Sequence, residues 1–333
     1  MTHFTDTVEL NEFISGLPKA ELHLHLEGSV QPEVWARLAG RNDPHLSVTP
    51  DDIREMLKYN SLSDFLFAFM ALTSCFREPD DFRLAALECG RELARHNVVY
   101  AEIHTSAAAG LSIGIPPREI MDAVITGLNE ARSEGGPEWG LIVDVIREMA
   151  VKDQGEIGLE LAMEYRNRGV VAIGLGGNEA KIPTSEAAAL FRAARDAGMH
   201  RTAHAGEAAG PESIRQALDI GAERIGHGVA AREDPELLCL LRDFRIPLEM
   251  CPSSNVCTGA VASMEEHPIA DYLRQGLLVT LSTDDPPFFH TDMNTEYARV
   301  AEAFDLSPAE IIQLSKNAFD AAFGVIPKSG FRF

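Results

Sequence analysis

Short apolar runs alternate with longer amphipathic segments along the chain. Most of the short runs are rich in β-branched residues or are followed by Gly or Pro, which is typical of strands. The expected strands cover residues 19–25, 98–105, 141–146, 170–175, 200–205, 224–228, 247–250 and 277–282. Strands that alternate with helices form a parallel sheet, and eight strands are enough to close a barrel. The pattern therefore predicts an α/β fold of the (β/α)8 type, a TIM barrel.

An open, doubly wound sheet is the alternative architecture, but no Gly-x-Gly-x-x-Gly turn follows the first expected strand. The segments between strands place apolar residues at helical spacing. Expected helices cover residues 119–132, 187–197 and 234–243, and a capping box at Ser307–Glu310 begins a further one. The chain shows no linker and no shift in composition, so residues 1–333 are expected to form a single domain.

One segment interrupts the regular alternation of strands and helices. Residues 27–95, between the first and second strands, form a stretch that is too long for one crossover helix, which predicts a helical insertion there. Within it, apolar side chains fall at positions i, i+3, i+4 and i+7 of a helix, namely Leu62, Phe65, Leu66 and Phe69. Taken alone, such a stripe indicates packing against the core.

Composition and charge narrow the possible partners and the location. The formal net charge is −22 at pH 7, whereas nucleic-acid backbones and anionic membranes attract clusters of Lys and Arg, so neither is an expected partner. The five cysteines include no Cys-x-x-Cys pair, which is typical of reduced thiols. No apolar run reaches the roughly 18 residues of a membrane span, and no signal peptide is expected, so the expected location is the cytoplasm. No motif specifies an oligomeric state.

Candidate catalytic groups gather at the ends of the expected strands. His23 and His25 alternate on the first strand and therefore point to the same side. His204 ends the fifth strand, His227 lies between two glycines at the sixth, and the pair Asp284–Asp285 follows the eighth. Each feature alone is more simply explained by packing or by an acidic turn. Together they lie where an α/β barrel builds its active site, at the carboxyl ends of the strands.

This set of side chains suits a metal-assisted reaction. Three imidazoles and one carboxylate suit a divalent ion such as Zn²⁺, and they leave a position for a water whose pKa would fall to about 7. Glu207, three residues after His204, could shuttle a proton, His227 could hold the attacking hydroxide, and Asp285 could contact the substrate. The set fits addition of water to an unsaturated carbon, followed by loss of a protonated leaving group.

Five segments carry a resemblance to a known family. They are Pro18–Ser29 (PKAELHLHLEGS), His204–Glu207 (HAGE), Gly226–Gly228 (GHG), Cys251–Asn255 (CPSSN) and Ser282–Pro286 (STDDP). In this order they resemble the motifs of the adenosine deaminase family, over residues 14–323 or so. The resemblance implies a (β/α)8 barrel with one zinc ion per chain. It also implies that adenosine or 2′-deoxyadenosine, a small-molecule purine nucleoside, is hydrolysed at C6 to inosine or 2′-deoxyinosine and ammonia.

The resemblance further implies roles for individual residues. The expected zinc ligands are His23, His25, His204 and Asp284. Glu207 would protonate purine N1, and His227 would orient the attacking hydroxide. Asp285 would contact N7, and the backbone N–H of Gly177 would lie near N3. The apolar stripe described above would form a lid over the substrate.

Three positions depart from the common pattern of that family. Gly174 and Asn178 stand where many adenosine deaminases have Asp, and Glu27 stands where many have an Asp that reaches the ribose 5′-hydroxyl. The purine end of the site is expected to be retained, and the 5′ end of the substrate is left open. Alternative substrates are aminodeoxyfutalosine, an adenine nucleoside with a bulky 5′ extension used in menaquinone synthesis, and free adenine. The segments around Gly177 and Asn255 look more like those of the nucleoside enzymes.

Two other functions fit parts of the pattern. A two-metal amidohydrolase would have a metal-bridging Lys at the end of the fourth strand, where this chain has Gly-rich sequence and Lys181 lies beyond it. A non-enzymatic nucleoside-binding protein would resemble relatives that act outside cells, which have an extra N-terminal domain and a signal peptide. This chain shows no sign of either feature, and every catalytic position is filled.

Overall fold

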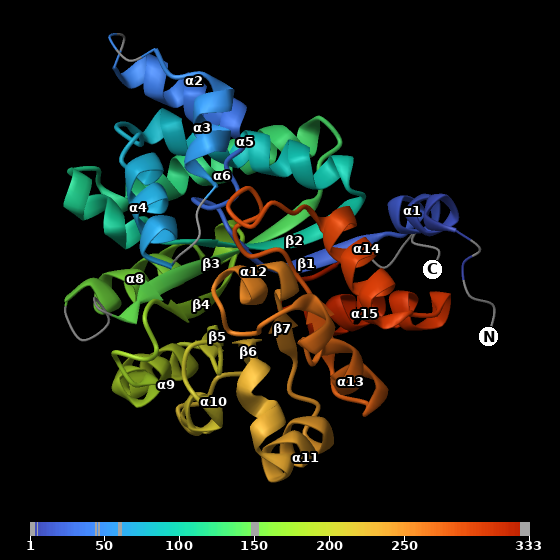
Figure 1. Ribbon diagram of the computed structural model, residues 1–333. Helices are drawn as coiled ribbons and strands as arrows, with labels where there is room; N and C mark the ends of the chain where they lie inside the picture. The colour runs from blue at the N-terminus through green and yellow to red at the C-terminus, as the bar shows by residue number, and fades with distance from the viewer. Residues whose placement is uncertain are drawn as a thin grey trace.

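The computed structural model describes residues 4, 6–43, 45, 47–58, 62–147 and 153–326, except for the side chains of residues 62–64, 66, 153 and 154. Eight strands form one sheet, in which each strand pairs in parallel with the next along the chain (Figure 1). The strands are β1 (Lys19–His25), β2 (Val98–Thr105), β3 (Glu138–Ile146), β4 (Val170–Gly176), β5 (His200–Ala205), β6 (Arg224–His227), β7 (Leu248–Met250) and β8 (Val279–Leu281). The predicted barrel is therefore confirmed.

The last and first strands meet through the residues that follow β8. Leu24 and Asp284 form a parallel bridge, in which the His25 N–H donates to the Asp284 carbonyl at 3.0 Å. The Asp284 N–H in turn donates to the His23 carbonyl at 3.1 Å. This pairing nearly closes the barrel, and it fixes Asp284 between the two histidines of β1.

Helices surround the strands (Figure 1). They are α1 (Thr7–Gly16), α2 (Pro32–Asn42), α3 (Pro50–Met56), α4 (Leu62–Thr73), α5 (Pro79–Arg95), α6 (Pro117–Ser133), α8 (Asp153–Glu164), α9 (Ala188–Asp196), α10 (Pro211–Asp219), α11 (Pro235–Asp243), α12 (Pro252–Cys257), α13 (Ile269–Arg274), α14 (Met293–Phe304) and α15 (Pro308–Ala321). Short 3-10 turns are η1 (Ala107–Ile113), η2 (Arg166–Arg168), η3 (Thr184–Ala187), η4 (Val229–Glu233) and η5 (Met264–Glu266).

Local sequence explains where many helices begin. Proline opens α2, α3, α5, α6, α10, α11, α12 and α15, where its fixed φ suits the first turn and its missing N–H costs no helical hydrogen bond. At α15 the Ser307 side chain accepts from the Glu310 N–H, and the Glu310 side chain accepts from the Ser307 N–H. The capping box expected from the sequence is therefore present.

The long stretch between β1 and β2 contains α2, α3, α4 and α5, as the predicted helical insertion requires. On α4, Phe65 and Phe69 pack against the loop that follows β8. The Phe65 ring lies 5.4 Å from the Phe289 ring, and the Phe69 ring lies 5.3 Å from the Phe288 ring. The side chains of Leu62 and Leu66 lie outside the described part of the structure.

Buried charged side chains form a network inside the barrel, and we call this region the floor of the barrel. Arg224 on β6 is buried and forms ion pairs with Glu102 on β2 at 2.6 Å and with Glu249 on β7 at 2.5 Å. The backbone N–H groups of Phe323 and Gly324 donate to Glu102 Oε1 at 2.6 and 3.0 Å. The segment after α15 therefore reaches the floor of the barrel.

All five cysteines are free thiols, in agreement with the expected reduced state. Of the helices described, none is long and apolar enough to cross a membrane.

Candidate metal centre and active site

His23 and His25 point to the same side of β1, and Asp284 lies beside both of them. The Oδ1 atom of Asp284 is 3.5 Å from His23 Nε2 and 3.3 Å from His25 Nε2. The third imidazole comes from the end of β5, where His204 Nε2 lies 3.2 Å from His25 Nε2. Side chains from β1, β5 and the β8 loop thus converge on one buried point.

The other ring nitrogen of each imidazole has a partner of its own. His23 Nδ1 bonds Glu249 Oε2 at 2.9 Å, His25 Nδ1 lies 3.1 Å from Asp144 Oδ2, and His204 Nδ1 bonds the Leu175 carbonyl at 3.1 Å. A carbonyl or a carboxylate accepts, so each Nδ1 carries the hydrogen, and in a neutral ring Nε2 keeps a lone pair. Partners of this kind are typical of histidines that bind a metal.

The positions of these lone pairs indicate whether a cation would fit the site. His25 Nε2 and His204 Nε2 face each other at 3.2 Å, and His23 Nε2 has no hydrogen-bond partner within the described residues. Converging lone pairs beside a carboxylate repel one another unless a positive charge lies among them. Burial alone would lower the pKa of His23, but Asp284 and Glu249 raise it to about 9. The same negative surroundings would attract a divalent cation, so these residues fit a metal.

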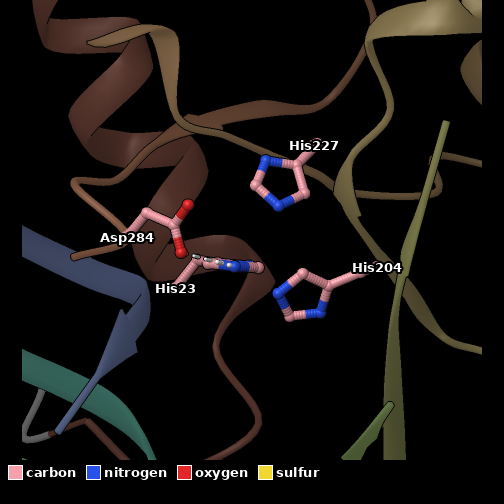
Figure 2. A group of neighbouring side chains, drawn as sticks. All are labelled: His23, His204, His227 and Asp284. Carbon is pink, nitrogen blue, oxygen red and sulfur yellow. Dashed lines mark ion pairs between the residues drawn. The ribbon is translucent and has the colours of Figure 1, made fainter. Parts of the chain in front are cut away.

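The structure also brings His227 to this point. One ligand atom from each of His23, His204, His227 and Asp284 lies within 4.8 Å of the others, and all four side chains are buried (Figure 2). The set expected from the sequence has His25 in place of His227. Both imidazoles are near enough to be considered, so distance alone does not choose the ligand set.

Two of these residues have unusual backbone conformations. His227 and Asp284 have φ values of 63° and 66°, in the left-handed region, which costs about 1–3 kcal/mol for a residue other than Gly. Gly226 precedes His227 because a Cβ there would lie 2.8 Å from the His23 ring. The surrounding contacts must therefore hold both side chains in place, as is common at functional sites.

Glu207 lies next to His227, and its side chain is partly exposed to solvent. Its Oε2 is 3.5 Å from His227 Nε2, and Thr258 Oγ1 donates to its Oε1 at 3.2 Å. The Glu207 side chain is 20% exposed, whereas His227 is 1% exposed. Glu207 is therefore placed to exchange a proton with a bound molecule while it stays close to the metal-binding group.

A second glutamate holds the backbone that carries Glu207. The buried Glu179 carboxylate accepts hydrogen bonds from the four successive N–H groups of residues 206–209, including the Glu207 N–H at 2.6 Å. Ser213 Oγ, in the first turn of α10, donates to it at 2.7 Å. Successive N–H groups around one carboxylate form an anion-binding nest, which fixes the loop after β5.

Asp285 is buried beside Asp284. Its Oδ1 has no hydrogen-bond partner among the residues described, although a buried polar oxygen usually has one. Burial and the neighbouring Asp284 raise the pKa of Asp285 to about 8. A ligand with a polar ring edge would supply the missing partner.

Other residues expected to bind the substrate lie around the same end of the barrel. Gly177 directly follows β4 and is exposed. Glu27 follows β1, and its Oε1 accepts from the Ser106 N–H at 3.0 Å and from Thr105 Oγ1 at 3.2 Å. Burial raises the pKa of Glu27. Its carboxylate is thus hydrogen-bonded to the end of β2 and to the residue that follows it.

Sequence reasoning missed the polar residues that lie within the strands. His104 Nδ1 and His25 Nδ1 share the Asp144 carboxylate, at 2.8 and 3.1 Å. The Asp144 carboxylate fits in its place because residue 174 is a glycine. A Cβ at Gly174 would lie 2.0 Å from Asp144 Oδ1. The available signal was an isolated His, Asp or Glu within an otherwise apolar run, as at His104, Asp144 and Glu249.

Comparisons with known proteins agree with this geometry. The profile of the adenosine deaminase family matches residues 18–329. The aminodeoxyfutalosine deaminase of Streptomyces avermitilis is 39% identical over 326 residues, which cover 95% of this chain and 89% of that protein. The crystal structure of adenine deaminase from Arthrobacter aurescens has a TM-score of 0.85 and 30% identity, with 93% of this chain and 94% of that chain covered. An amidohydrolase from Burkholderia ambifaria with bound Zn has a TM-score of 0.84 and 26% identity, with 97% and 90% covered.

The match spans nearly all of the chain, and the aligned relatives are covered over most of their own length. At the strand ends, one group of side chains could hold a metal ion, and the Glu207 carboxyl group lies 3.5 Å from a member of it, His227. The chain therefore belongs to the adenosine deaminase family, as a hydrolytic deaminase of an adenine-type substrate.

Proposed function

We propose that this protein binds one zinc ion and removes the 6-amino group of an adenine nucleoside with a 5′ extension, aminodeoxyfutalosine. The observation that carries the reaction is the convergence of three imidazole Nε2 atoms and Asp284 beside Glu207. The choice of substrate is supported by the relative from Streptomyces avermitilis, which bears that name and is 39% identical.

We assign His23, His25, His204 and Asp284 as the residues that would hold zinc. Nitrogen and carboxylate ligands suit Zn²⁺, and the related amidohydrolase with bound Zn supports that choice of metal. When bound, zinc would supply hydroxide at neutral pH by lowering the pKa of water to about 7. No other role of the metal is needed in the steps assigned to the side chains.

The remaining residues act on the purine and on the attacking oxygen. Glu207 would donate a proton to N1, which makes C6 more electrophilic. His227 would hold the attacking oxygen next to C6. Asp285 and the Gly177 N–H would hold N7 and N3, so that the ring lies flat against the site. The attacking oxygen adds to C6, and the proton of the added hydroxyl passes to the 6-amino group. The C6–N bond then breaks, so that ammonia leaves and the C6 carbonyl of the product remains.

Adenosine is the second candidate substrate. Glu27 would keep a carboxylate at the 5′ end of the site, where it would accept a hydrogen bond from a free 5′-hydroxyl. Its attachment to Ser106 and Thr105 places it on the β2 side. The residue is therefore the first to test for a difference between the two nucleosides.

The test is a panel assay on zinc-loaded protein, with aminodeoxyfutalosine, adenosine, 2′-deoxyadenosine and adenine as substrates. We expect the highest kcat/KM on aminodeoxyfutalosine. A higher kcat/KM on adenosine would move the substrate to the second candidate, and a preference for adenine would contradict both. Equal and negligible turnover of all four would contradict the proposed reaction itself.

A variant tests the role of the acid. We expect Glu207→Gln to keep zinc and to lose at least about 100-fold in kcat, the usual scale for removing a positioned acid. The matched control is Glu212→Gln, an exposed glutamate on α10, which should leave kcat unchanged. Near-normal turnover in Glu207→Gln would remove Glu207 from this role.

A further inference from the structure

A chain of buried hydrogen bonds leads from a backbone N–H to His227. The Ile269 N–H donates to His267 Nδ1 at 3.3 Å, and His267 Nε2 lies 3.1 Å from Asn255 Oδ1. Asn255 Nδ2 lies 3.1 Å from His227 Nδ1. The residues His267, Asn255 and His227 are 2%, 0% and 1% exposed, so water does not compete for these atoms.

The direction of every bond follows from the first donor. A backbone N–H only donates, so His267 Nδ1 accepts and His267 Nε2 carries the hydrogen. This hydrogen points at Asn255, which must present its oxygen there. The NH2 group of Asn255 then points at His227 Nδ1, which accepts. The neutral His227 ring is therefore left with its hydrogen on Nε2.

A doubly protonated His267 would break this order, because two N–H groups would face each other at Nδ1. Burial lowers the pKa of His267 to about 3, and the nearby charges of Arg232 and His227 act in the same direction. The ring is therefore neutral over the range in which the protein would work.

The tautomer decides what His227 can do. Its Nε2–H points toward Glu207 Oε2, at 3.5 Å. In this form Nε2 has no lone pair, so it donates a hydrogen bond and does not bind a metal. His25 has the opposite arrangement, with Nδ1 at Asp144 and a lone pair on Nε2. This chain of hydrogen bonds, which we call the relay, thus favours His25 over His227 as the metal ligand. Distance alone does not make that choice.

We propose that Asn255 and His267 are positioning residues, which fix His227 in the Nε2–H tautomer so that it orients the attacking oxygen instead of binding the metal. The proposal rests on the function assigned above and deepens it. The Asn255→Asp variant tests it most directly, because a carboxylate is nearly the same shape and only accepts. Asp at this position would accept from His267 and from His227 Nδ1, and would move the His227 hydrogen from Nε2 to Nδ1.

The first readout is the protonated nitrogen of His227, measured by long-range ¹H–¹⁵N NMR on zinc-loaded, histidine-labelled protein. A His227→Asn sample identifies the signal. We expect hydrogen on Nε2 in the native protein and on Nδ1 in Asn255→Asp. The control Asn129→Asp adds the same charge on the exposed face of α6 and should leave the tautomer unchanged. Hydrogen on Nδ1 in the native protein would overturn the proposal.

The second readout is kinetic. A wrong histidine tautomer costs up to about 10⁴-fold in kcat in a well-studied triad enzyme, and we expect a loss of at least about 100-fold for Asn255→Asp. KM should change less than about threefold, a split that general loss of structure would not give. A reversed tautomer with unchanged kcat would overturn the positioning role.

A second pair of variants tests the relay even if Asn255→Asp does not fold. His267→Gln keeps an N–H donor toward Asn255 and should keep the His227 tautomer, whereas His267→Glu presents an acceptor and should reverse it. The same tautomer in both variants would overturn the relay. Because NMR needs no substrate, a native protein with the expected tautomer and no deaminase activity would contradict the proposed function and not the relay.

Discussion

Two groups of buried polar side chains lie within the barrel, and they differ in how their charges are compensated. On the floor, Arg224 pairs with two carboxylates, and Glu102 also receives N–H groups from residues 323 and 324. At the carboxyl ends of the strands, three imidazole nitrogens and Asp284 converge without a cationic side chain among the described partners. The first group has its compensating cation within the chain, and the second has room for one from outside. This difference separates a structural network from a binding site.

We call the side chains that converge at the carboxyl ends of the strands the upper group, and those on the floor the lower group. Removing a member of the upper group should have the largest effect on function. We expect His25→Ala to lose its zinc, and with it all measurable turnover, because one of the three imidazole ligands assigned to the metal is removed. Metal content after dialysis, measured by elemental analysis, checks this. The control His45→Ala changes an exposed histidine and should keep one zinc per chain. A His25→Ala protein that retains one equivalent of metal would remove His25 from the ligand set.

Removing the cation of the lower group should instead affect stability. Arg224→Met leaves Glu102 and Glu249 buried without their common partner, and breaking a buried pair in this way costs about 3–5 kcal/mol. Urea unfolding measures the loss. The control Arg195→Met breaks an exposed pair with Asp196 and should leave the midpoint unchanged.

A second substitution sharpens this test of the floor. Adding Glu102→Gln to Arg224→Met removes one of the unpaired charges, and part of the lost stability should return. An unchanged free energy of unfolding in Arg224→Met would mean that the floor network is not structural.

The sequence predicted the barrel and the upper group well, for a physical reason. Parallel strands buried on both faces read as short apolar runs, and functional side chains come at the ends of those runs, where His204 and Asp284 are easily seen. The expected start of the third strand, at residue 141, was wrong. β3 begins at Glu138, before the apolar run, because Glu138 and Trp139 pair with Tyr100 and Ala101 of β2.

The supporting residues could not be predicted in the same way, because their partners are far away in the sequence. Glu249 meets a histidine 226 positions earlier, and Glu179 accepts from N–H groups 27–30 residues later. Asn255 was visible within a motif, but its role depends on the direction of two hydrogen bonds that only the fold defines. A one-dimensional pattern indicates which residues lie at strand ends and says little about what holds them.

Glu249 belongs to both groups, and it therefore provides the finest test of the comparison. One oxygen pairs with Arg224 at 2.5 Å, and the other accepts from His23 Nδ1 at 2.9 Å. Burial alone would raise the pKa of Glu249, but Arg224 and His23 lower it to about 2, so the group is a carboxylate. Its charge therefore stabilises the floor and, in the proposed metal site, would also make His23 Nε2 a more basic ligand.

We expect Glu249→Gln to weaken zinc binding by about 10- to 100-fold, the usual effect of losing the outer partner of a metal-bound histidine. Competition with a chelator of known affinity measures the zinc Kd, and kcat at saturating zinc should change less than the Kd. Asp144→Asn makes the matched change behind His25 and should weaken zinc to a similar degree. If Glu249→Gln lowered stability as much as Arg224→Met and left the zinc Kd unchanged, Glu249 would belong to the floor alone. The two groups would then be independent rather than joined through His23.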